Sequence, residues 1–228
     1  IKDLYAQISK SVYRQTYHIQ PVTGLSSDPN GFTCHKGTWH LFYQWTPWGA
    51  VHGLKYWYHA KSTDLVHWEN AGVGMRPDRD FDNKGCHSGS AIAAGDSLYF
   101  FYTGNHRDEN WVRTPYTCAA KLDESGTPVK LDEPLFGPRD DYSEHQRDPK
   151  VIYNEENQTY YILIGAQTLD KKGTILMNGN NGTISSNPAV KTKCELLKQQ
   201  NALQKTISDL ESALKLSIES PHSVIDDE

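Results

Sequence analysis

The stretch "DPNGFTCHKGTWHLFYQ", residues 28–44, follows a plan that occurs twice more in this chain of 228 residues. The segments "SGSAIAAGDSLYFFYTG" (88–104) and "DPKVIYNEENQTYYILIG" (148–165) show the same order of features. Each begins with a small or polar residue, continues as a short strand, turns through Gly, Asp or Asn, and ends in an aromatic-rich strand. The three openings are 60 residues apart, which indicates an internal repeat of β-hairpins.

A repeat of strands with this period favours a β-propeller over a β-sandwich. Further strands are predicted between the repeats, at Lys55–Ser62 ("KYWYHAKS") and Tyr116–Leu122 ("YTCAAKL"). In a propeller the innermost strand of each blade lines a central channel, so equivalent positions lie around one axis. We therefore expect Asp28, Ser88 and Asp148 to converge at one end of that channel. Paired carboxylates in a pocket are typical of sites that split glycosidic bonds.

The composition argues against several other functions. A net charge of −5 gives no electrostatic support for binding nucleic acid or an anionic membrane surface. No apolar run approaches the roughly 18 residues of a membrane span, and "IKDLYAQISK" at the start lacks the apolar core of a secretory signal. The first residue is Ile rather than Met, from which we expect a fragment or a processed product.

The cysteines and histidines suggest neither disulfides nor a metal. The four cysteines are widely spaced and form no CxxC pair, which is typical of reduced, mostly buried thiols in a cytoplasmic protein. None of the ten histidines forms an HExxH-type ligand pair. We therefore expect a cytoplasmic protein without a metal and without a cofactor.

The composition changes at Asn178. Residues 178–190 are rich in Asn, Gly and Ser and contain Pro188, which predicts a linker. Residues 191–220 predict an amphipathic helix, because leucines recur every seven residues at positions 196, 203 and 210. Such a helix offers a seam for self-association as a coiled coil. Residues 221–228 form an acidic tail.

Five motifs occur in the order found in glycoside hydrolase family 32, and the chain resembles this family over about residues 15–177. The family comprises invertases, fructanases and bacterial sucrose-6-phosphate hydrolases, and the loop "GAVHGLKYWYHA" is similar to the bacterial branch. The resemblance implies a mainly β fold, a five-bladed propeller followed by a β-sandwich. Residues 1–177 would supply about three of the blades, with the C-terminal α-helix added. The motifs are "SSDPNGF" (26–32), "LFYQW" (41–45), "STDLVHWE" (62–69), "GCHSGSA" (85–91) and "QRDPKV" (146–151).

The resemblance implies retaining cleavage through a covalent fructosyl-enzyme. Asp28 would be the nucleophile that attacks the anomeric carbon of the fructosyl unit. Asp148 would hydrogen-bond the fructosyl hydroxyls and stabilise the transition state, and Arg147 would hold that carboxylate ionised. The alternatives are that Asp28 is a turn residue and that Asp148 belongs to a structural ion pair.

The same resemblance implies a set of substrate-binding residues. Asn30 and Gln44 would donate amide hydrogen bonds to sugar hydroxyls, and Ser88 would add a hydroxyl from the second blade. Trp48 is a candidate wall for the sugar, although ordinary loop packing is an equal alternative.

A phosphate on the substrate would need a basic partner, for which Lys55, Arg76 and Arg79 are candidates. Each of them has surface charge as its simpler interpretation. Three further tryptophans are expected in the blade cores: Trp39, Trp57 and Trp68.

The chain departs from the family pattern at several positions. Ser27 stands where the family usually has Asn, and Leu25 where it has Trp. The family's general acid/base is a Glu in a Glu-Cys motif, expected near residue 200. No Glu-Cys pair occurs here, and Cys194-Glu195 has the reverse order and lies on the predicted helix.

The predicted function is therefore cleavage of the β-fructofuranosidic bond of sucrose or sucrose 6-phosphate, impaired by the missing acid. General acid catalysis contributes about 10²–10⁴-fold, and an open propeller also exposes unpaired strand edges. One alternative is a non-catalytic carbohydrate-binding protein, or one that oligomerises through the helix. Another is a chain without an independent function.

Overall fold

The computed structural model describes residues 1–156 and 158–178, and these form three antiparallel sheets and two short helices. Contacts divide the chain into two units, one of Ile1–Val151 with Leu163–Met177 and one of Ile152–Ile162 with Asn178–Glu228. The predicted helix over 191–220, the acidic tail and most of the predicted linker lie outside the described residues. The mainly β prediction is confirmed.

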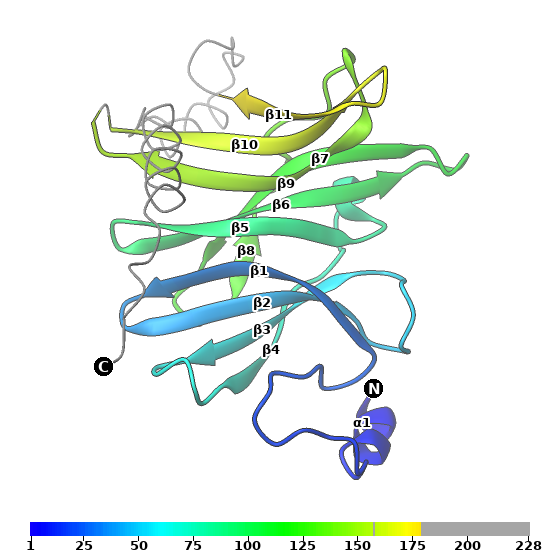
Figure 1. Ribbon diagram of the computed structural model, residues 1–228, viewed down its shortest axis with the longest axis vertical. Coiled ribbons are helices and arrows are strands. Elements are labelled where there is room, and N and C mark those ends of the chain that lie inside the picture. Colours follow the sequence, from blue (N-terminus) through cyan, green and yellow to red (C-terminus); the bar gives the residue numbers. More distant parts are fainter. Residues whose placement is uncertain (157, 179–228) are drawn as a thin grey trace, which may run out of the picture. The chain divides into compact units, whose positions relative to one another are not determined.

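The three sheets follow one another along the sequence (Figure 1). The first has the order β1-β2-β3-β4, the second β5-β6-β7-β8 and the third β11-β10-β9. Their strands are β1 (Leu25–His35), β2 (Thr38–Thr46), β3 (Tyr56–Ser62), β4 (Glu69–Met75), β5 (Cys86–Ala94), β6 (Ser97–Arg107), β7 (Arg113–Leu122), β8 (Pro128–Lys130), β9 (Tyr142–Asn154), β10 (Thr159–Thr168) and β11 (Gly173–Asn178).

The predicted hairpins occupy the expected places. The three repeats form β1–β2, β5–β6 and β9–β10, and their openings lie in the first strand of each sheet. The two strands predicted between the repeats coincide with β3 and with most of β7. Because β1 and β5 lie side by side (Figure 1), the first and second sheets present their opening strands to each other.

Two helices were not expected from the sequence. Helix α1 (Lys2–Ile8) has no buried residue, and a single turn of 3₁₀-helix, η1 (Asp80–Asp82), precedes β5. No helix among the described residues is long and apolar enough to cross a membrane.

An aromatic core lies between the first two sheets. Phe42, Trp57, Phe100 and Tyr102 are fully buried and contact one another with ring centroids 4.9–6.5 Å apart. Gly31 has a φ of 56°, and a Cβ there would lie 3.1–3.4 Å from three of these rings. Glycine therefore allows β1 to approach the core closely.

Two tryptophan predictions were wrong. Trp57 belongs to the core, but Trp39 and Trp68 are only partly buried. Trp39 stacks on the exposed ring of Phe32, and Trp68 lies beside an open pocket. Both lie on or beside outer surfaces of the first sheet, where an amphipathic ring is tolerated. The three cysteines that lie in the described residues are free, with Cys86 and Cys118 buried and Cys34 exposed.

The opening strands are joined by polar contacts that also recur every 60 residues. The Asn30 side chain accepts a hydrogen bond from the Gly89 backbone N–H (3.0 Å), which links β1 to β5. At the equivalent position Ser90 donates to the Pro149 carbonyl (2.8 Å) and accepts from the Val151 N–H (3.0 Å), which links β5 to β9. Both side chains are buried, so these bonds are shielded from water and fix how neighbouring strands meet.

A buried ion pair ties β8 to η1. Lys130 Nζ lies 2.5 Å from a carboxylate oxygen of the fully buried Asp82, and 2.9 Å from Asp78. The Tyr102 hydroxyl donates to the same Asp82 oxygen (2.8 Å). A buried carboxylate requires this degree of compensation, since removing one partner would leave an unpaired charge.

A histidine pair is buried within the first sheet. His40 Nδ1 and His59 Nε2 are 3.0 Å apart, and Phe42 stacks on His59. Burial lowers the pKa of both imidazoles, that of His59 to about 3. Lys61 lowers both pKa values further, as His35 does for His40 and His40 does for His59. Because both pKa values are lowered, the pair is neutral at pH 7, and one ring donates its N–H to the other.

We predict that acid destabilises the fold through this pair. The unfolded chain takes up protons near pH 6.5, before the folded chain does, so this stability is complete above pH 6.5 and is lost as pH falls toward about 3. His59→Gln should therefore reduce the slope of unfolding free energy against pH, between pH 6.5 and 5, by up to about 1.4 kcal/mol per pH unit. Urea unfolding at several pH values measures this slope. Substituting the exposed His67 by Gln is the control, and an unchanged slope in His59→Gln would contradict the prediction.

Candidate active site

The backbone is irregular at each of the three repeat openings, although not in the same way. The β1–β2 register shifts between Ser26 and Pro29, and the β5–β6 register shifts between His87 and Gly89. The bulges therefore place Asp28 and Ser88 out of the regular pleat, and Asp148 has a left-handed φ of 61°. Bulges and strained residues near sites serve to redirect side chains.

Ser88 and Asp28 meet as the repeat predicts. Ser88 Oγ donates a hydrogen bond of 2.5 Å to Asp28 Oδ2, and Gln44 Nε2 donates to the same oxygen at 3.1 Å. The Gln44 amide also lies 2.5 Å from Ser88 Oγ. No other residue among those described donates a hydrogen bond to Asp28 Oδ1, and the residue is exposed. One carboxylate oxygen is thus held in place, and the other is open to an incoming ligand.

A chain of polar contacts continues from Gln44 to Lys55. Ser27 Oγ donates to Gln44 Oε1 (3.4 Å), and Lys55 Nζ donates to Ser27 Oγ (3.3 Å). Ser27, which departs from the family pattern, therefore orients the amide that contacts Asp28. The contact brings the charge of Lys55 close to the carboxylate.

Asp148 is positioned from the second sheet. Its backbone N–H donates to Thr103 Oγ1 (2.9 Å), and the Thr103 hydroxyl donates to the Ser88 carbonyl (3.2 Å). Arg147 Nε lies 3.5 Å from Asp148 Oδ2, and both side chains are about half exposed. Thr103 therefore couples the left-handed turn at Asp148 to the bulge at Ser88.

The pKa values of the two aspartates are shifted in opposite directions. The Ser88 hydrogen bond, assisted by the Asp28 backbone N–H and by the charge of Lys55, holds the pKa of Asp28 below its usual value against a partial desolvation. Burial raises the pKa of Asp148, and repulsion from Asp28 adds to it, whereas Arg147 and Arg113 oppose the rise. Carboxylates with pKa values pushed apart are suited to different roles in one reaction.

The remaining predicted residues differ in exposure. Asn30 is 2% exposed and its amide is engaged, since Nδ2 donates to the Asp28 carbonyl (2.8 Å) and Oδ1 accepts from Gly89. Trp48 is 60% exposed in the loop between β2 and β3, with its ring 5.8 Å from that of Tyr56. Asn30 therefore shapes the turn that carries Asp28, and Trp48 stands at its margin.

The three basic residues predicted as phosphate partners have different contacts in the structure. Lys55 reaches the site, whereas Arg79 pairs with Asp132 at 3.3 Å, and the Arg76 carbonyl accepts a bond from Lys130. The sequence did not point to Thr103 or Arg113, because neither belongs to a quoted motif.

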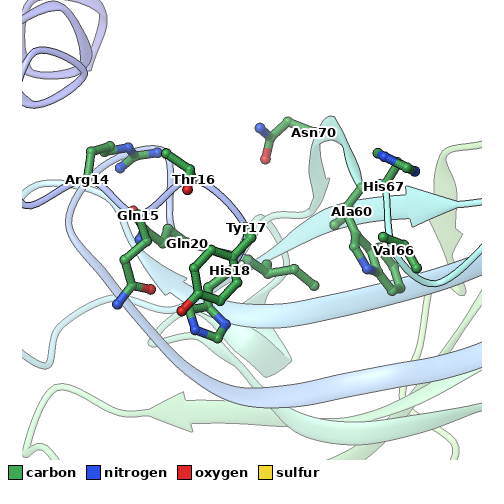
Figure 2. A pocket seen from close by; sticks show the side chains of 12 residues that line it. Arg14, Gln15, Thr16, Tyr17, His18, Gln20, Ala60, Val66, His67 and Asn70 are labelled. Carbon is green, nitrogen blue, oxygen red and sulfur yellow. The ribbon is translucent and has the colours of Figure 1, made fainter.

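A pocket of about 310 Å³ lies elsewhere, between the segment 14–20 and the outer part of the first sheet. Figure 2 shows Arg14, Tyr17 and His18 on one side of it and His67 and Asn70 on the other. None of its lining residues is a predicted site residue. No three His, Cys, Asp or Glu side chains gather into a possible metal group within residues 1–156 and 158–178.

An exposed carboxylate of lowered pKa, held by a serine and an amide and within electrostatic reach of a second carboxylate of raised pKa, resembles the carboxylate pair of glycoside hydrolases. A sequence profile described as "Glycosyl hydrolases family 32 N-terminal domain" matches residues 18–185. The chain belongs to this family.

Relatives with known names support the assignment. The chain is 48% identical over 175 residues to the sucrose-6-phosphate hydrolase of Streptococcus mutans, which covers 77% of this chain and 36% of the relative. It is 50% identical over 169 residues to that of Lactococcus lactis, covering 73% and 35%. It therefore spans about a third of the length of these relatives.

Solved structures agree at the level of the fold. The sucrose-6-phosphate hydrolase of Lactobacillus gasseri superposes with a TM-score of 0.74 at 45% identity, covering 77% of this chain and 36% of that one. A family 32 β-fructofuranosidase of Bombyx mori gives a TM-score of 0.66 at 28% identity, covering 78% and 39%. A mutant of that enzyme has been solved in complex with sucrose.

We predict that Ser88→Ala raises the pKa of Asp28. Removing a hydrogen bond to an ionised group costs about 1.5–3 kcal/mol, which corresponds to a rise of roughly one unit or more. Titration of the carboxyl carbons by NMR measures this directly. Asp123, whose carboxylate is bonded to Ser125, provides an internal reference that should not move. An unchanged Asp28 titration would contradict the assignment of the short contact.

Proposed function

We propose that the chain carries the nucleophile and fructosyl-binding half of a retaining β-fructofuranosidase site that acts on sucrose or sucrose 6-phosphate. The single observation that supports this most is the Asp28 carboxylate, fixed through Oδ2 by Ser88 and Gln44 while Oδ1 stays open. The names of the relatives supply the substrates, and the sucrose complex of a family member favours the same sugar.

The proposed roles follow from the contacts. Asp28 Oδ1 attacks the fructosyl anomeric carbon, and its lowered pKa keeps it ionised at neutral pH. Asp148 accepts hydrogen bonds from fructosyl hydroxyls as positive charge develops on the ring, with Arg147 beside it. Gln44 and Ser88 position the nucleophile, Asn30 shapes its turn, and Trp48 stands as a side wall.

The three sheets are proposed to be three consecutive blades of the family's propeller. The 60-residue recurrence of hairpins, bulges and side-chain contacts between opening strands supports this. Residues 1–177 would form the blade region, followed by the linker, helix and tail. Self-association through that helix and a cytoplasmic setting remain part of this proposal.

The general acid decides how far the reaction proceeds. Cys194-Glu195 lies outside the described residues, and the sequence has no Glu-Cys pair. In a retaining enzyme the same residue protonates the leaving oxygen in the first step and activates the attacking water in the second step. Without it, both release of glucose and hydrolysis of the fructosyl-enzyme are slow, so a donor that needs no protonation would trap the intermediate.

We predict that β-fructofuranosyl fluoride labels Asp28. Fluoride departs without an acid, so the purified chain should gain the mass of one fructosyl residue, and peptide mapping should place it at residue 28. Asp28→Asn should reduce the labelling rate about 10³-fold or more. Asp96→Asn, which removes a carboxylate that is 99% exposed, is the matched control and should label normally.

Two outcomes would overturn this proposal. Equal labelling of Asp28→Asn would show that another group reacts. Measurable binding of sucrose without any labelling would favour the non-catalytic carbohydrate-binding alternative.

A further inference from the structure

Arginines gather at the end of the strands where the candidate site lies. Arg107, the last residue of β6, and Arg113, the first of β7, are directly paired in the register of these strands. Arg147 precedes Asp148 on β9. Three guanidinium groups therefore lie on three strands of the unit that also holds Asp28.

Two of these groups have no acidic partner. Arg113 Nε donates to Asn105 Oδ1 (2.8 Å), and Arg107 Nη1 donates to the Trp111 carbonyl (2.7 Å). Neither forms an ion pair with a carboxylate in the part of the chain that the structure describes. Because Asn105 orients Arg113 through Nε, its two terminal nitrogens are left as a fork of donors.

The third arginine is partly neutralised. Arg147 Nε lies 3.5 Å from Asp148 Oδ2, and its Nη1 lies 3.2 Å from His145 Nδ1. Its remaining donors contact no carboxylate among the described residues, so a second anion could share this side chain.

The local field favours an anion. Burial lowers the pKa of the half-buried Arg113, and the charges of Arg147 and Arg107 lower it further, whereas Glu144 and Asp148 act in the opposite direction. The three arginines therefore repel one another in the free chain, and a bound anion would relieve this repulsion.

The same cations reach the fructosyl site. Burial lowers the pKa of His87, next to Ser88, to about 4, and the charges of Arg113, Lys55 and Arg147 add to this effect. The imidazole is therefore neutral at pH 7 and neither adds to nor cancels the cluster. Arg113 is also close enough to Asp148 to oppose the rise of its pKa.

An aromatic side chain completes the margin of the cluster. Trp111 is 62% exposed in the loop between β6 and β7, with Arg107 and Lys84 stacked over its ring at 5.2 and 5.3 Å. Trp48 occupies the corresponding loop of the first sheet, between β2 and β3. An exposed ring beside cations suits a ligand with an apolar sugar face and an anionic group.

We propose that Arg113, assisted by Arg107 and Arg147, binds the phosphate of sucrose 6-phosphate and so distinguishes it from sucrose. This inference rests on the proposed function and replaces Arg76 and Arg79 as phosphate candidates. A phosphate monoester carries a charge of about −1.5 to −2 at pH 7 and accepts paired hydrogen bonds from a guanidinium fork. The negative charges of Asp148 and Glu144 limit the affinity that the arginines can add.

The test compares binding of sucrose, sucrose 6-phosphate and glucose 6-phosphate to the full chain by calorimetry. Arg113→Gln should weaken binding of sucrose 6-phosphate by roughly 10- to 100-fold, and so bring its affinity close to that of sucrose. Arg113→Lys should retain part of the preference, because it keeps the charge but loses the fork. Lys36→Gln, which removes one charge at the far end of β1, is the matched control and should preserve the preference.

The outcomes separate the two proposals. If sucrose binds and the phosphate adds no affinity, or if Arg113→Gln keeps the full preference, the arginine assignment fails while the proposed function stands. If glucose 6-phosphate binds through Arg113 but sucrose does not bind, the arginine site stands and the fructosyl site fails. Circular dichroism of Arg113→Gln should match that of the unchanged chain, and Arg113→Lys provides the second reading if it does not.

Discussion

The hydrogen bond from Ser88 to Asp28 is the contact on which the candidate site depends. It joins the opening strands of the first two sheets, and it lowers the pKa of the carboxylate that it holds. Gln44 and Thr103 extend it, one toward Lys55 through Ser27 and the other toward Asp148. A loss of this contact would therefore change the pKa of Asp28 and the positions of its neighbours together.

This contact is possible because the opening strands are held together by buried polar and aromatic groups. Asn30 and Ser90 reach across to backbone groups of the next strand, and the rings of Phe42, Trp57 and Phe100 fill the space behind them. Buried hydrogen bonds are directional, whereas aromatic packing tolerates small shifts. The polar contacts therefore determine the register of the site, and the rings contribute apolar burial behind it.

Much of this arrangement was predictable from the sequence, for identifiable reasons. The 60-residue spacing placed Asp28 beside Ser88 because hairpins of equal length bring equivalent positions together. The bulges at Asp28 and Ser88, the left-handed turn at Asp148 and the Thr103 contact were not predictable, since they depend on registers and on bonds between residues 45 or more apart. Arg113 was not predictable as a site residue for the same reason, because its role depends on Arg107 and Arg147, which the folded strands bring near it. Trp39 and Trp68 were assigned to the core by residue type alone, and their positions on outer surfaces contradict this.

The central claim is that Asp28 is a nucleophile with one oxygen held and the other free. The most direct measurement is a crystal structure of the chain after reaction with β-fructofuranosyl fluoride. The account predicts continuous density from Asp28 Oδ1 to the fructosyl anomeric carbon, with Ser88 and Gln44 still bonded to Oδ2. A sugar bound without contact to Asp28, or joined to a different side chain, would contradict it.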